Sequence, residues 1–224
     1  MESKNKTNRL LWTGLLLIVL FVVWTYLVQT VDVQTAGESG TAVGFATFNT
    51  WFHQMTGVHL RWYTVTDWLG LVPVFICMGF AVLGLKQLIQ RKSLWNVDYD
   101  ILALGVYYVL VIVGYLVFEM VPINYRPILI DGRMEASYPS STTLLVLSVM
   151  PTLVFQMKLR MKNLRVQHII STITVLFTCG MVLGRLFSGV HWFTDIVGAV
   201  LLSGGLYVIY KAVVSWNLEK NFKN

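Results

Sequence analysis

Charged residues are scarce in this chain of 224 residues: 12% are Asp, Glu, Lys or Arg, whereas 56% are hydrophobic and the mean hydropathy is +0.65. A soluble globular domain carries about 25% charged residues. The scarcity excludes an ordinary soluble domain and indicates a polytopic membrane protein whose length suits one domain. The net charge of +6 comes from basic residues scattered between apolar segments, which is typical of membrane topology rather than of a nucleic-acid partner.

Cysteine is almost absent. Cys77 and Cys179 both lie within apolar runs, which predicts buried thiols and excludes a disulfide framework or a cysteine metal site. The sequence also lacks internal repeats, low-complexity tracts and linkers. No small-residue cleavage site of the A-x-A type follows the first apolar run, so we expect that run to be retained as a membrane span.

Long apolar runs are what the sequence has instead. A helix needs about 20 residues to cross the hydrocarbon core of a bilayer. Six stretches are long enough, and they predict an all-α, six-span transmembrane bundle that forms one integral membrane domain over residues 1–224, with its core at about 60–215. The expected spans are residues 10–31, 67–89, 100–122, 140–157, 168–187 and 191–214.

Basic residues alternate between the connections and predict the orientation. They gather in both terminal tails and after the second and fourth spans, at Lys4, Lys6, Arg9, Lys86, Arg91, Lys92, Lys158, Arg160, Lys162, Arg165, Lys211, Lys220 and Lys223. The positive-inside rule makes these regions, and therefore both termini, cytoplasmic. The first outer connection, about 32–66, contains FNTWFHQMTGVHLRWY, whose mixture of aromatic and polar residues predicts an interfacial helix.

The stretch GRLFSGVHWFTDIVG places Arg185, His191 and Asp195 beside long apolar runs. Ionisable residues in such segments are costly and usually functional. His191 and Asp195 are four residues apart at the start of the last span, so we expect them to share one helix face, where the carboxylate orients the imidazole and stabilises its charged form. The pair Ser188-Gly189 provides a break that brings Arg185 back toward His191.

A second outer connection adds a rigid dipeptide, Arg126-Pro127, and the run Tyr138-Pro139-Ser140-Ser141-Thr142-Thr143. Two guanidinium groups can hold phosphate oxygens by bidentate hydrogen bonds. A proline near a helix start, followed by hydroxyl residues, leaves backbone N–H groups that can point at an anion. The pattern predicts a phosphate site made by Arg126, Arg185, Ser140, Ser141 and Thr142.

The order of these motifs resembles that of the type 2 phosphatidic acid phosphatases (PAP2), which share a fold with vanadium haloperoxidases, over about residues 60–215. That family carries K-x6-R-P, P-S-G-H and S-R-x5-H-x3-D. The resemblance implies a membrane lipid phosphatase with its active site outside the plasma membrane. His191 would form a phosphohistidine with Asp195 as its partner, while Arg126, Arg185 and Ser140 would hold the phosphate. It implies no metal or other cofactor and no nucleic acid. Its partners are a lipid phosphate and the bilayer, and the oligomeric state stays open.

Four positions depart from the family motifs. The first-motif Lys falls at Glu119, the second-motif Gly and His fall at Ser141 and Thr142, and the third-motif Ser falls at Gly184. In the family that His protonates the leaving alkoxide, and acid assistance of this kind is worth about 10²–10⁴-fold.

Three interpretations therefore remain open. A substitute acid could come from the outer loop, with Glu119, Asp131, Glu135 and Tyr138 as candidates, although Glu119 is equally expected to pair with Arg126. Alternatively, the substrate could be a polyprenyl diphosphate, whose departing phosphate needs no acid. Finally, the protein could bind or transport phosphorylated lipid without hydrolysing it. Of the other histidines, His53 and His59 are expected to be structural, and His168 to lie on the cytoplasmic side.

Overall fold

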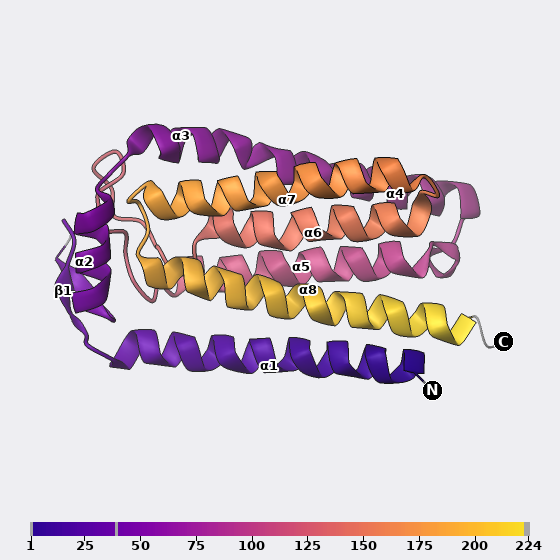
Figure 1. The fold of residues 1–224 in the computed structure, drawn as a ribbon, viewed down its shortest axis with the longest axis horizontal. Helices are drawn as coiled ribbons and strands as arrows, with labels where there is room; N and C mark the ends of the chain where they lie inside the picture. Colours follow the sequence, from indigo (N-terminus) through magenta and orange to yellow (C-terminus); the bar gives the residue numbers. More distant parts are fainter. Residues whose placement is uncertain (1, 39, 222–224) are drawn as a thin grey trace.

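The computed structural model describes residues 2–38 and 40–221, and within them the chain is a bundle of long, roughly parallel helices (Figure 1). The α-helices are α1 (Glu2–Thr30), α2 (Ala46–Thr56), α3 (Leu60–Leu69), α4 (Leu71–Arg91), α5 (Tyr99–Met120), α6 (Ser141–Arg160), α7 (Leu164–Phe187) and α8 (Phe193–Asn221). A 3-10 turn, Leu94–Asn96, precedes α5, and β1 (Gln34–Ala36) pairs antiparallel with β2 (Thr41–Val43).

Six helical segments are long and apolar enough to cross a membrane, which confirms the predicted all-α architecture and its number of spans. They are Asn5–Thr30, Leu60–Arg91, Tyr99–Met120, Ser141–Arg160, Leu164–Phe187 and Phe193–Lys220. Apolar runs form helices in a bilayer because every backbone N–H and C=O must be satisfied within the segment. Large apolar side chains such as Phe75, Val82 and Leu176 consequently cover the outside of the bundle.

The second span begins earlier than predicted, at Leu60 rather than at residue 67. The aromatic segment 48–63 is divided between two elements: α2 ends at Thr56, and α3 continues across Gly70 into α4 as one membrane-crossing unit. The helix α2 lies crosswise at one end of the bundle (Figure 1), as expected of an interfacial helix. Residues of α3 that the sequence assigned to a loop therefore lie on a helix that contacts α7.

The helix α8 is the centre of the packing, with α1, α5 and α6 against it. The buried core includes Leu104, Tyr107, Leu144 and Ala199, and hydrogen bonds between helices add to it. Tyr107 Oη donates to the Ser148 carbonyl oxygen at 2.8 Å. In membranes such interhelical bonds are worth about 0.6–2 kcal/mol each. This packing fixes where α8 begins, which is where the candidate site lies.

Thr194, in the first turn of α8, ties this helix to α1 and α2. Its carbonyl oxygen accepts a hydrogen bond from Trp24 Nε1 at 3.1 Å, and its hydroxyl accepts one from Asn49 Nδ2 at 3.0 Å. Nearby, the hydroxyl groups of Thr25 and Tyr138 are 2.7 Å apart. The first span is therefore bonded to both segments that lead into the site.

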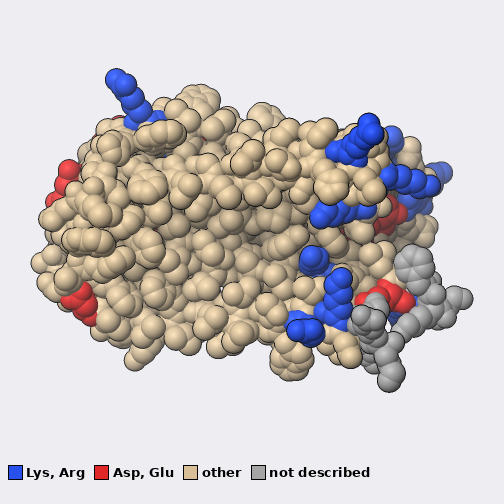
Figure 2. All heavy atoms as spheres, viewed as in Figure 1, with Lys and Arg blue, Asp and Glu red and all other residues tan. Residues whose placement is uncertain are grey.

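Both chain ends lie at one end of the bundle, and most Lys and Arg residues gather there (Figures 1 and 2). Lys223 and the side chain of Lys4 lie outside the described residues. Arg61, Arg126, Arg133 and Arg185 belong to the segments at the opposite end. This distribution follows the predicted alternation of basic loops, and the side of the membrane that each end faces stays a prediction.

Both cysteines are free, as predicted. Cys77 in α4 is partly buried, but Cys179 is exposed on α7, so the prediction of two buried thiols is wrong for Cys179. The difference arises because an apolar run faces lipid as readily as it faces the protein interior.

Candidate active site

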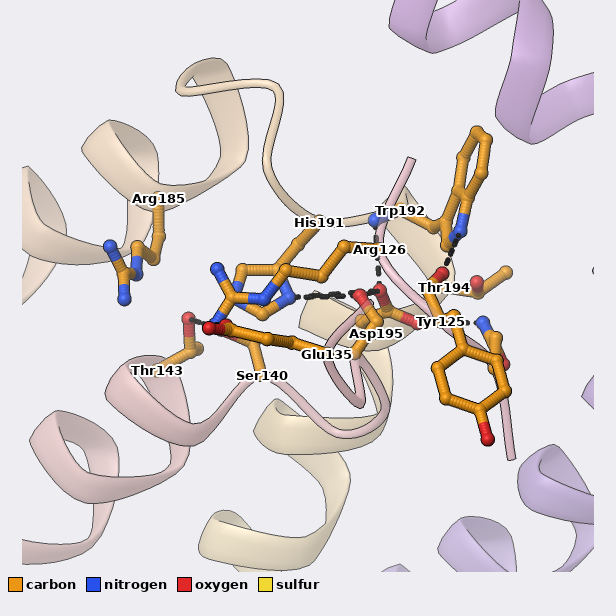
Figure 3. A network of polar contacts seen from close by, with 12 residues as sticks. Tyr125, Arg126, Glu135, Ser140, Thr143, Arg185, His191, Trp192, Thr194 and Asp195 are labelled. Carbon is orange, nitrogen blue, oxygen red and sulfur yellow. Dashed lines mark hydrogen bonds and ion pairs between the residues drawn. The ribbon is translucent and has the colours of Figure 1, made fainter. Parts of the chain in front are cut away.

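The candidate site lies at the end of the bundle opposite the chain termini, where α7 ends, α6 and α8 begin, and the loop 121–140 crosses between them (Figures 1 and 3). Arg185 is in the last turn of α7, His191 in the turn before α8, and Arg126 in the loop. Figure 3 shows Arg126, Arg185, His191 and Asp195 together. Residues far apart in the sequence thus meet as predicted.

The turn between α7 and α8 packs against α2 and the segment that joins α2 to α3. Gly189 has φ 73°, and a Cβ there would lie 2.3 Å from the Gly57 carbonyl oxygen, so only glycine fits. The Ser188 carbonyl oxygen accepts a hydrogen bond from the His59 backbone N–H at 2.9 Å, and His53 Nε2 lies 3.1 Å from the Gly189 carbonyl oxygen. His53 and His59 thus support the turn that carries His191.

His191 and Asp195 do not share a helix, which corrects the sequence-based expectation. The helix α8 begins at Phe193, where the Asp195 carboxylate caps it by accepting the Trp192 backbone N–H at 2.8 Å, so His191 lies in the turn that precedes the helix. His191 Nδ1 and Asp195 Oδ2 are 3.8 Å apart, too far for a hydrogen bond. Ser137 bridges them, with its Oγ 2.5 Å from Asp195 Oδ2 and 3.1 Å from His191 Nδ1.

This bridge assigns the protons on the imidazole. A serine hydroxyl has one proton, and Ser137 donates it to the Asp195 carboxylate; His191 Nδ1–H must then donate to Ser137 Oγ. Asn124 Nδ2 completes the support of Asp195 with a 2.9 Å hydrogen bond to Oδ1. Nε2 of His191 is left with a lone pair, the form in which a histidine acts as a nucleophile.

The surroundings of His191 favour this neutral form. Burial, followed by the nearby positive charges of Arg126 and Arg185, lowers the pKa of His191 well below its ordinary value of 6.5. Nε2 of His191 therefore keeps its lone pair, and it is buried with no hydrogen-bond partner among the described residues.

Arg185 is almost completely buried and is held by acceptors from α3 and α6. Its Nη2 donates to Asp67 Oδ1 at 3.2 Å and to Thr142 Oγ1 at 2.6 Å, and its Nη1 donates to Thr66 Oγ1 at 3.3 Å. The guanidinium carbon lies 4.7 Å from the centre of the Tyr63 ring. These contacts fix the guanidinium plane while its Nε has no partner within the described part of the chain.

Arg126 is held more loosely. Its Nη2 forms an ion pair with Glu135 Oε2 at 3.1 Å, and its guanidinium carbon lies 5.6 Å from the centre of the same Tyr63 ring. In the ranges 2–38 and 40–221, its Nε and Nη1 are buried without partners. A buried donor without an acceptor costs about 1–3 kcal/mol. The free donors of both arginines thus mark a place for an anionic acceptor.

The hydroxyl run at the start of α6 contributes less than predicted. The Ser140 N–H donates to the Asp195 carbonyl oxygen at 3.2 Å and its Oγ to Thr143 Oγ1 at 3.0 Å, so the expectation that Ser140 offers a free N–H is wrong. Ser141 lines a small groove between α5 and α6, and Thr142 contacts Arg185. The start of α6 is thus bonded to the first turn of α8 through the Asp195 carbonyl oxygen.

Among the four candidate acids, Glu135 contacts a residue of the site. Tyr138 is buried and its Oη is bonded to Thr25 on α1, which takes it out of the site. Asp131 is exposed in the loop. Glu119 is exposed at the end of α5. Arg126 forms its ion pair with Glu135, so the expected Glu119–Arg126 pair does not form among the described residues.

Several contributors were not predicted from the sequence. Ser137 and Asn124 are single polar residues in an irregular loop, and Tyr63, Thr66 and Asp67 lie on a helix whose contact with α7 no local pattern reveals. Within the described ranges, no group of three or more His, Cys, Asp or Glu side chains is arranged to hold a metal ion.

The fold and site define a class: a six-span membrane protein with a neutral, buried histidine facing two arginines. Residues 121–219 match the sequence model of the PAP2 superfamily. The chain is also similar to the crystal structure of the first transmembrane PAP2-type phosphatidylglycerolphosphate phosphatase from Bacillus subtilis, with a TM-score of 0.59 and 17% identity, over 92% of this chain and 96% of that one. Among curated protein sequences, none matches significantly. These findings confirm the resemblance to the PAP2 superfamily predicted from the motifs.

Proposed function

We propose that this protein is a membrane lipid phosphatase that removes phosphate from a lipid phosphate or a polyprenyl diphosphate at the extracytoplasmic face, through a phosphohistidine on His191. One observation carries the proposal: the unpartnered Nε2 of His191 is buried together with unpartnered N–H groups of Arg126 and Arg185. A phosphate group has oxygens for the donors and an electrophilic phosphorus for the lone pair. The match to the PAP2 superfamily over residues 121–219 supports the same reaction.

In this mechanism, phosphate oxygens accept hydrogen bonds from Arg126 and Arg185 while Nε2 attacks the phosphorus. As the P–N bond forms, the bond from phosphorus to the oxygen of the lipid, or to the bridging oxygen of the diphosphate, breaks and the lipid product leaves. The positive charge that develops on the imidazole is stabilised through Nδ1–H, Ser137 Oγ and the Asp195 carboxylate. Water then cleaves the P–N bond and releases inorganic phosphate. Ser137 and Asp195 keep the imidazole in one orientation during both steps.

The position of the site suits a lipid substrate. It lies at one end of the membrane-crossing segments, where the headgroup of a lipid would sit while its chains lie along the apolar exterior. Basic residues gather at the other end of the bundle (Figure 2). By the positive-inside rule, the end that carries the site then faces the outside. Cysteines introduced at Arg133 and Lys162, after Cys77 and Cys179 are replaced, test this with an impermeant reagent in intact cells. Labelling at 162 but not at 133 would reverse the orientation.

Binding without turnover is the second candidate. It is favoured by Thr142, which stands where the resemblance expects an acid and instead accepts a hydrogen bond from Arg185. Both candidates use the same arginines, so affinity for a phosphorylated lipid does not distinguish them.

Phosphate release does distinguish them. Purified protein is offered phosphatidic acid, phosphatidylglycerol phosphate and a polyprenyl diphosphate, beside the variants His191→Ala and His168→Ala. We expect release by the wild type and by the His168 variant. His168 lies in the first turns of α7, whereas Arg185 of the site lies in the last turn of the same helix. The His191 variant should bind lipid phosphate without releasing phosphate. Full activity in that variant would overturn the proposal, and wild-type binding with no release would favour the binder.

A further inference from the structure

A carboxylate from α3 reaches the site from a direction that the motifs do not cover. Asp67 Oδ1 lies 3.2 Å from Arg185 Nη2, and the same nitrogen lies 2.6 Å from Thr142 Oγ1. Asp67 and Thr142 thus accept hydrogen bonds from the same nitrogen of Arg185. Thr142 is the position where the resemblance expects the acid. We infer that Asp67 protonates the oxygen of the lipid leaving group, an inference that rests on the proposed phosphatase function.

The close packing of α3 on α7 explains how Asp67 arrives there. A Cβ on Gly184 would lie 2.7 Å from Thr66 Cγ2, so the absence of a side chain at 184 lets α3 approach. Tyr63, Thr66 and Asp67 are spaced three and four residues apart and lie on the helix face that contacts Arg185. Two departures from the family motifs, at Gly184 and at Thr142, therefore occur where α3 meets α6 and α7.

Accessibility also suits an acid that meets substrate. The Asp67 side chain is 59% exposed, whereas the Arg185 side chain to which it is bonded is 2% exposed. Asp67 is thus held at one oxygen and open to an incoming lipid headgroup. By contrast, Tyr138, a candidate from the sequence, is buried against α1.

The direction of attack suits an acid at Asp67. Arg185 lies on the side of the imidazole opposite Asp195 (Figure 3). Because Nδ1 faces Ser137 and Asp195, the attacking Nε2 faces the Arg185 side. In an in-line displacement the leaving oxygen departs on the far side of phosphorus from the nucleophile. Asp67, which is bonded to Arg185, then lies on the side toward which the leaving oxygen departs.

The chemistry balances with Asp67 supplying a proton in the first step and regaining one after the second. The cycle starts with Asp67 protonated. As the bond from Nε2 to phosphorus forms, the bond from phosphorus to the lipid oxygen breaks, and that oxygen takes the Asp67 proton to leave as an alcohol. Water then attacks the phosphorus as the P–N bond breaks, which releases neutral His191 and H₂PO₄⁻. A proton from this phosphate returns to Asp67.

The test compares two leaving groups in one preparation of Asp67→Asn. Phosphatidic acid expels an alkoxide that needs a proton, whereas a polyprenyl diphosphate expels a phosphate that does not. We expect hydrolysis of phosphatidic acid to fall by about 10²–10⁴-fold, the value of one acid group, and diphosphate hydrolysis to fall far less. The ratio of the two rates does not depend on the folded fraction. Asp67→Glu, which restores a carboxyl group, should recover part of the phosphatidic acid activity.

Glu135→Gln is the matched control, because Glu135 is also a partly exposed carboxylate paired with a site arginine. It should change both rates by similar factors. Equal losses on both substrates in Asp67→Asn would overturn the inference and leave Asp67 a positioning residue for Arg185. A selective loss in Glu135→Gln instead would assign the acid to Glu135. A wild-type protein that hydrolyses neither substrate would overturn the phosphatase itself, and the role of Asp67 with it.

Discussion

The two sides of the His191 ring differ in how completely they are bonded. On the Nδ1 side, Ser137 bridges to Asp195, whose carboxylate also accepts from Asn124 and from the Trp192 N–H. On the Nε2 side, donors of two arginines and the nitrogen itself have no partners within residues 2–38 and 40–221. The saturated side needs nothing more to be stable, while the unsaturated side costs free energy until an acceptor arrives. In the proposed mechanism, this contrast separates the residues that orient His191 from those that bind the phosphate.

The largest expected effect on phosphate release comes from replacing Asp195, the carboxylate on the Nδ1 side of His191. Asp195→Asn replaces a buried carboxylate that accepts three hydrogen bonds with an amide whose NH₂ group cannot accept any of them. The charge that stabilises the imidazolium is lost as well. We expect kcat for phosphate release to fall by about 10²–10⁴-fold while lipid-phosphate affinity stays near the wild-type value. An unchanged kcat would show that Asp195 has no part in activating His191.

A substitution on the Nε2 side of the ring should reduce phosphate release somewhat less. Arg185→Lys keeps the charge but loses the planar group that contacts Asp67, Thr66 and Thr142 at once. By analogy with the loss of one preorganised donor, we expect kcat/KM to fall by about 10²–10³-fold.

Arg126→Lys is the matched comparison, measured with the same lipid. Arg126 has one ionic partner, so its replacement should cost less than that of Arg185. A larger loss for Arg126→Lys would mean that the number of fixed contacts does not measure an arginine's importance here.

Ser137→Ala tests the hydroxyl that bridges His191 and Asp195. Ser137→Ala leaves His191 Nδ1 and Asp195 Oδ2 separated by 3.8 Å with no hydroxyl between them. One hydrogen bond of this kind is worth about 0.5–1.5 kcal/mol, so kcat should fall by roughly tenfold. Ser137→Thr, which keeps the hydroxyl, should retain more of the rate. If Ser137→Ala and Ser137→Thr are equally impaired, the side chain's volume matters rather than its hydroxyl.

The smallest expected effect is a shift in pH dependence. Since the pKa of His191 is lowered below 6.5, the neutral nucleophile persists in acid, and the acid limb of kcat/KM should lie below pH 6.5. Arg126 contributes to this lowering, so Arg126→Met should raise the pKa and move the acid limb to higher pH. Glu119→Gln, which changes an exposed charge on α5, serves as the control and should leave the limb in place. A limb that stays fixed in Arg126→Met would assign it to another group.

The sequence predicted those features that depend on a fixed spacing or a long apolar run. Six spans follow from hydropathy, and Arg126, Arg185, His191 and Asp195 follow from motifs in order along the chain. It did not predict Ser137, because one serine in an irregular loop has no periodicity to identify it. Nor did it predict Asp67, whose role depends on how closely α3 packs against Gly184, a tertiary contact between residues distant in sequence.

The start of the last span was also misplaced for a physical reason. Hydropathy continues from Val190 into α8, but the Asp195 carboxylate binds the Trp192 N–H and makes the chain turn there. The first N–H groups of a helix lack carbonyl partners within it, so the Asp195 carboxylate caps α8 at Trp192. The residue that was predicted to share a helix face with His191 instead caps the helix that begins two residues after that histidine.

Hydrogen bonds from α1 to Thr194 and Tyr138 limit how far this chain can be shortened from its N-terminal side without disturbing the site. Trp24 and Thr25 lie outside residues 121–219, yet they bind Thr194 at the head of α8 and Tyr138 two residues before the cap of α6. A truncated protein without α1 would expose these polar groups to lipid, where water cannot replace the lost partners. A truncation to residues 121–219 would therefore keep Arg126, Arg185 and His191 but lose both Asp67 and the hydrogen bonds that hold Thr194 and Tyr138.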